Sequence, residues 1–70
     1  MPTAFEIRYR STSNAFNFMM AQHGLSFNTQ QFEEAYILFD RLQHVGKYGN
    51  LDMVNQLEQD LDSFIAKYNL

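Results

Sequence analysis

The sequence predicts a mainly helical fold in which one short N-terminal strand precedes three helices. Three observations lead to this prediction. Apolar and polar residues alternate over residues 5–10, a well-capped helix begins near Asn28, and apolar residues recur at helical spacing over residues 51–68. Seventy residues make a single domain, 1–70, and seven Phe with four Tyr are many for so short a chain. One copy would struggle to bury them, so the composition favours a homodimer.

The segment 5–10 alternates between an apolar and a charged face, as a strand does. The apolar face contains Phe5, Ile7 and Tyr9, and the charged face contains Glu6, Arg8 and Arg10. A lone strand cannot satisfy its own backbone groups. No second strand is evident in the sequence, so we expect it to pair with the same strand of another copy.

A first helix is predicted from about Ser13 to His23, with Ser11 or Ser13 as its N-cap. Gly24 is expected to end it in a left-handed C-cap conformation. The helix carries one apolar stripe at helical spacing, formed by Ala15, Phe16, Met19 and Met20.

The second helix has the clearest start. Asn28 is a strong N-cap, and Gln31 three residues later completes a capping box. Phe27 and Phe32 have the spacing of a hydrophobic staple. The main buried face is predicted to contain Phe32, Ala35, Tyr36, Phe39 and Leu42. Ile37, Leu38 and Val45 widen this face, so we expect the helix to be covered on more than one side. Gly46 and Gly49 are expected to bracket a turn.

The third helix is predicted from Leu51 to about Tyr68, with Asn50 as its N-cap. Its apolar residues form a narrow seam suited to pairing with another helix: Leu51, Val54, Leu57, Leu61, Phe64 and Tyr68. The link to the second helix is short, so an antiparallel helical hairpin is expected.

Composition argues against several classes of protein. There is no cysteine, no visible signal peptide and no apolar run near the ~20 residues that cross a bilayer, so we expect a cytoplasmic protein without membrane contact. His23 and His44 match no metal or catalytic pattern, and we expect neither a cofactor nor an enzyme. Residues 1–31 carry two Arg and one Glu, whereas residues 32–70 carry seven acidic and three basic residues.

Two sequence stretches resemble a known family. The first is Phe5-Glu6-Ile7-Arg8-Tyr9, and the second, after a helix of suitable length, is Gly24-Leu25-Ser26-Phe27-Asn28-Thr29. Together they are similar to the Arc/Mnt group of phage ribbon-helix-helix repressors over residues 4–45, with residues 50–68 as an additional C-terminal helix. The resemblance implies a homodimeric transcriptional regulator, in a bacterial or phage-infected cell, that reads operator DNA with its N-terminal strand.

The resemblance also implies specific site residues. The outward strand face would read bases through Ala4, Glu6 and Arg8, with Arg10 nearby, and the start of the second helix would clamp a phosphate through Ser26, Asn28 and Thr29. The dimer interface would contain Phe5, Ile7, Tyr9, Phe16, Met19, Met20, Phe32, Tyr36 and Phe39.

Two alternatives stay open. The chain can instead be a non-enzymatic interaction module, such as a virus-encoded inhibitor of a host or defence protein, whose acidic C-terminal helices contact a basic protein surface. The segment 57–68 also resembles the signature helix of small sporulation regulators, helical hairpins that dephosphorylate a response regulator. Their motif Ser-Gln-Glu-Leu-Asp appears here as Glu58-Gln59-Asp60-Leu61-Asp62.

Overall fold

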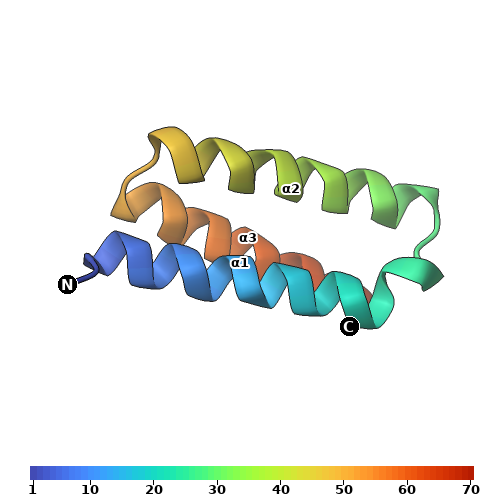
Figure 1. Ribbon diagram of the computed structural model, residues 1–70. Helices are drawn as coiled ribbons and strands as arrows, with labels where there is room; N and C mark the ends of the chain where they lie inside the picture. The colour runs from blue at the N-terminus through green and yellow to red at the C-terminus, as the bar shows by residue number, and fades with distance from the viewer.

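The computed structural model describes residues 1–70 as a bundle of three α-helices (Figure 1). These are α1 (Ala4–His23), α2 (Thr29–Tyr48) and α3 (Leu51–Tyr68), with a short 3-10 turn, η1 (Gly24–Ser26), between the first two. α1 and α3 run in one direction and α2 in the other, and the bundle measures 39 × 18 × 17 Å. α3 packs against both other helices more extensively than these pack against each other. No helix combines the length and hydropathy that crossing a membrane requires.

The predicted N-terminal strand is wrong, because residues 5–10 form the first turns of α1. Thr3 caps this helix by accepting a hydrogen bond from the Glu6 amide at 3.1 Å. Phe5 and Tyr9 are four residues apart and pack against the core, whereas Ile7 lies on the other side and is 56% exposed. The helix satisfies its own backbone groups, so no second strand is required, and the ribbon-helix-helix fold is ruled out.

The end of α1 also differs from the prediction. Gly24 has φ −56°, which is right-handed helical geometry, and its amide donates to the Met20 carbonyl. The chain therefore continues into η1 rather than stopping at a left-handed cap. Of the predicted stripe, Phe16 and Met19 are buried, Met20 is partly buried and Ala15 is exposed.

The starts of the other two helices are confirmed. Asn28 Oδ1 accepts from the Gln31 amide at 2.8 Å, and Gln31 Oε1 accepts from the Asn28 amide at 2.9 Å, which makes the capping box complete. Asn50 Oδ1 accepts from the Met53 amide at 3.0 Å. The antiparallel hairpin is confirmed as well (Figure 1). The turn predicted from Gly46 is wrong, since α2 continues to Tyr48.

The buried face of α2 agrees only in part with the prediction, because Leu38 and Val45, expected to widen it, are buried in place of the three aromatic residues. Ala35 and Leu42 are buried as expected, but Phe32, Tyr36 and Phe39 keep 56%, 59% and 43% of their surface exposed. The buried residues of this helix are Ala35, Leu38, Leu42 and Val45. α2 carries apolar residues on two sides, and α3 selects the side that contains Leu38. The staple is incomplete because Phe27 packs on Phe64, with ring centroids 5.9 Å apart, while Phe32 faces solvent.

The core lies along the seam predicted for α3, which is confirmed at its centre. Val54, Leu57, Leu61 and Phe64 are all at most 6% exposed. Thr12 of α1 is buried in the same core, and its hydroxyl has no hydrogen-bond partner. An unpaired buried hydroxyl costs about 1–3 kcal/mol, so this position weakens the centre of the bundle.

Candidate functional site

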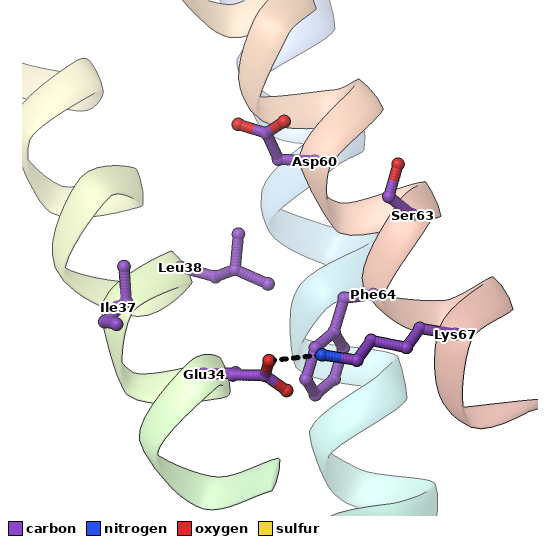
Figure 2. Close-up of a pocket in the computed structure, with 7 residues that line it drawn as sticks. All are labelled: Glu34, Ile37, Leu38, Asp60, Ser63, Phe64 and Lys67. Carbon is purple, nitrogen blue, oxygen red and sulfur yellow. Dashed lines mark hydrogen bonds and ion pairs between the residues drawn. The ribbon is translucent and has the colours of Figure 1, made fainter. Parts of the chain in front are cut away.

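A groove of about 250 Å³ between α2 and α3 combines apolar and charged lining residues (Figure 2). Its lining residues come from two turns of each helix: Glu34, Ile37, Leu38, Asp60, Ser63, Phe64 and Lys67. Leu38 and Phe64 belong to the core and form the floor. Ile37 forms the edge and is 59% exposed. The groove therefore offers an apolar floor that solvent reaches.

One end of the groove is crossed by an ion pair. Lys67 Nζ donates to Glu34 Oε1 at 2.6 Å, as the dashed line in Figure 2 shows, and the Tyr68 hydroxyl donates to the other carboxylate oxygen. Glu34 comes from α2 and both donors come from the last turn of α3. These side chains are partly exposed, so the pair can exchange partners with a charged group on a bound molecule.

The same contacts shift three pKa values. The hydrogen bond from Lys67 first, and that from Tyr68 second, lower the pKa of Glu34 below its ordinary 4.5. The hydrogen bond to Glu34 is the main cause that raises the pKa of Lys67 above 10.5 and that of Tyr68 above 10.0. All three shifts favour the charged carboxylate, the charged amine and the protonated phenol.

These shifts predict a pH dependence of stability. A lowered carboxyl pKa contributes stability that is present above pH 4.5 and is lost as pH falls through the folded value. The raised pKa values of Lys67 and Tyr68 contribute stability that is lost above about pH 10. The difference in Tm between the wild type and Glu34→Gln, measured by circular dichroism, should be largest near neutrality and shrink at both extremes. A difference that stays constant from pH 3 to pH 7 contradicts the prediction.

A second ion pair crosses the other end of the groove. Arg41 Nη1 of α2 lies 2.5 Å from Asp60 Oδ2 of α3, and Gln56 Nε2 donates to Asp60 Oδ1 at 3.1 Å. Ser63 lies between the two ion pairs along α3 (Figure 2). The groove is thus apolar at its base and bordered at both ends by charges that are already paired.

The arrangement suits binding. The Ser63 hydroxyl has no histidine beside it in the groove, and His44 packs instead on the Tyr48 ring, with centroids 5.3 Å apart. No group of three His, Cys, Asp or Glu side chains is placed to hold a metal ion. An apolar floor with a polar border is the usual anatomy of a protein–protein contact.

The residues predicted to read DNA are not brought together. Ala4, Glu6, Arg8 and Arg10 lie in the first turns of α1, whereas Ser26 to Thr29 lie at the start of α2, at the opposite end of the bundle (Figure 1). Arg8 Nη1 is paired with Glu58 Oε2 at 3.3 Å. The Asn28 side chain is occupied by its own helix cap.

The residues predicted for a dimer interface divide into two sets. Phe5, Tyr9, Phe16 and Met19 pack within the chain's own core, and Ile7 lies on the far side of α1. The exposed residues Phe32, Tyr36 and Phe39 line a separate apolar groove together with Phe16, Met20 and Ala35. Dimerisation itself stays a prediction.

The two ion pairs at the groove were missed from the sequence. A signal for them exists, because an antiparallel hairpin opposes residues at equal distances from its link. Glu34 and Lys67 are equally far from the Asn50–Leu51 bond, where α3 begins, and so are Arg41 and Asp60. Matching each charged residue of α2 with the residue that lies opposite it on α3 would have predicted both ion pairs.

No protein-family model, curated protein or solved structure matches this chain at a significant level.

Proposed function

We propose that this protein is a non-enzymatic protein-interaction module that binds a partner segment in the groove between α2 and α3. The observation that carries the proposal is the exposed edge at Ile37 beside the apolar floor of Leu38 and Phe64, bordered by two ion pairs. An apolar side chain of the partner fills the groove, and charged groups beside it exchange with the bordering pairs.

Charge identifies the kind of partner. α2 and α3 together carry seven acidic and three basic residues, and four of the acidic residues form no ion pair within the chain: Glu33, Asp40, Asp52 and Asp62. Glu33 is exposed and lies one helical turn before Ile37, on the same side of α2. A segment with an apolar anchor flanked by Lys or Arg therefore complements this surface.

The other functions expected from the sequence have less support. Base reading by a strand has no structural basis once residues 5–10 are helical, and Arg8 and Arg10 lie on different sides of α1. In the segment similar to sporulation regulators, Glu58 and Asp60 are held by Arg8 and Arg41. DNA binding and phosphatase activity stay predictions from resemblance alone.

Two synthetic helical peptides test the proposal: each carries the same leucine anchor, flanked in one by lysines and in the other by glutamates. Titration into the ¹⁵N-labelled protein should shift the amide resonances of Ile37, Ser63 and Phe64 with the lysine peptide and leave them in place with the glutamate peptide. Ile37→Lys should abolish the shifts, because it places a charge at the groove edge. Equal shifts with both peptides, or none with either, contradict the proposed function.

A further inference from the structure

A second apolar surface lies on the opposite side of α2, where that helix meets α1. Phe32, Tyr36 and Phe39 follow one another at helical spacing and are 56%, 59% and 43% exposed. They border a groove of about 200 Å³ whose other lining residues are Phe16, Met20 and Ala35. All six lining residues are apolar or aromatic. We call this surface the α1–α2 face.

The exposure of this face follows from how the bundle packs. α3 packs against the buried sides of both α1 and α2, whereas α1 and α2 pack least extensively against each other. At one end they are joined by Tyr9, whose hydroxyl donates to the Leu42 carbonyl at 2.8 Å. Towards the other end, the rings of Phe16 and Phe39 lie with their centroids 6.1 Å apart. The aromatic rings of α2 at this end stay partly exposed to solvent.

We infer that the α1–α2 face binds a second copy of this chain and forms a two-fold symmetric dimer. A two-fold interface uses the same patch on both copies, so a patch that contains both a projection and a recess can pair with itself. The α1–α2 face contains both. Tyr36 projects at its border, and the groove lies directly beside it. In the dimer the Tyr36 ring of each copy enters the groove of the other.

The charge of the face favours this occupant. Ser13 and Asn17 lie one helical turn from Phe16 and Met20 on α1. Gln43 lies one turn after Phe39 on α2, and all three of these neighbouring residues are uncharged. The groove that receives the Tyr36 ring is itself uncharged, so a charged anchor finds no complement inside it. The nearest acidic residues of α2, Glu33 and Asp40, lie one helical turn before and after Tyr36, at the border of the face.

The area constrains the dimer. One whole long side of the bundle, 39 × 18 Å, has a projected area of roughly 700 Å², so an interface that buries the typical ~800 Å² per partner uses nearly all of that side. Three aromatic rings that are each about half exposed contribute about 300 Å² of apolar surface at its centre, the lower end of the range for the largest apolar patch on a typical monomer. A 70-residue chain without disulfides has a small core, so burying this apolar surface in a dimer would add substantially to its stability.

Sedimentation equilibrium of the full chain over a wide concentration range tests the inference. The wild type should approach twice the monomer mass of 8.3 kDa. Tyr36→Lys should weaken dimerisation at least about 30-fold, as expected for a central aromatic anchor. The matched control is Ile37→Lys. Ile37 is the next residue along α2, is also 59% exposed, and points about 100° away around the helix axis.

The control should dimerise as the wild type does, and circular dichroism should show that both variants keep the wild-type helix content. A wild type that stays monomeric at the highest concentration overturns the inference, as does a Tyr36→Lys variant that dimerises normally. Equal loss of the dimer in both lysine variants, or assembly beyond two copies, excludes this face as a closed two-fold interface. The result is independent of the proposed function, because peptide binding depends on Ile37 and dimerisation on Tyr36.

Discussion

Replacement of Leu61 by alanine is expected to lower the free energy of unfolding by about 2–5 kcal/mol. Leu61 is 2% exposed and lies at the centre of the bundle, where it surrounds a small void together with residues of all three helices: Thr12, Phe16, Leu38, Leu42 and Leu57. The truncated side chain would enlarge that void, and the neighbouring helices cannot close it without losing their own contacts.

The loss is large relative to the total. A 70-residue domain has roughly 3–10 kcal/mol of stability in all, so Leu61→Ala should remove a large share of it. Urea denaturation followed by circular dichroism measures the effect. The matched control is Leu25→Ala, at a residue that is fully exposed in η1, and it should change stability by less than about 0.5 kcal/mol. Similar losses in the two variants would mean that the described core is wrong.

Replacement of Gly46 by alanine is expected to destabilise the protein by about 1–3 kcal/mol, although the same change stabilises most helices. Gly46 lies inside α2, and the Tyr9 ring of α1 packs directly on it. A Cβ atom at this position would lie 2.8 Å from Cζ and 3.2 Å from Cε1 of Tyr9. The ring must move, and its hydroxyl then loses the hydrogen bond to the Leu42 carbonyl.

A double-mutant cycle isolates this contact. With Tyr9→Leu as the background, the ring is gone, so Gly46→Ala should stabilise the helix by about 0.5–1 kcal/mol. The sign of the substitution therefore reverses between the two backgrounds, as urea denaturation of all four proteins would show. If Gly46→Ala stabilises the wild type as well, α1 and α2 do not approach each other at Tyr9.

These two contacts explain why the chain presents two separate surfaces. The core around Leu61 holds α3 against both other helices, and this keeps Leu38 and Phe64 together at the floor of the α2–α3 groove. The contact of Tyr9 with Gly46 joins α1 to α2 at one end only. The aromatic residues at the other end stay exposed, and they are the basis of the inferred dimer.

Local signals predicted the helix boundaries where a side chain acts on its own backbone. The caps at Asn28 and Asn50 depend on residues three positions away, and both are present as predicted. The α3 seam was also predictable, because that helix has one apolar stripe and a polar opposite face. The strand prediction failed at residues 5–10. The same six residues also fit a helix, because Phe5 and Tyr9 are four residues apart and both face the core. The N-cap at Thr3 favours this helix over a strand.

The sequence by itself determined that the chain is helical after Asn28, that α2 and α3 form a hairpin, and that α3 buries its seam, because each depends on neighbours within a few residues or on a short link. The tertiary structure alone decided which side of α2 is buried. Leu38 and Phe39 are adjacent and equally apolar, and only the position of α3 places one in the core and leaves the other partly exposed. A helix with two apolar sides has no local preference between them. Both candidate surfaces follow from that choice, since burial of Leu38 leaves Ile37 on one side and Tyr36 on the other.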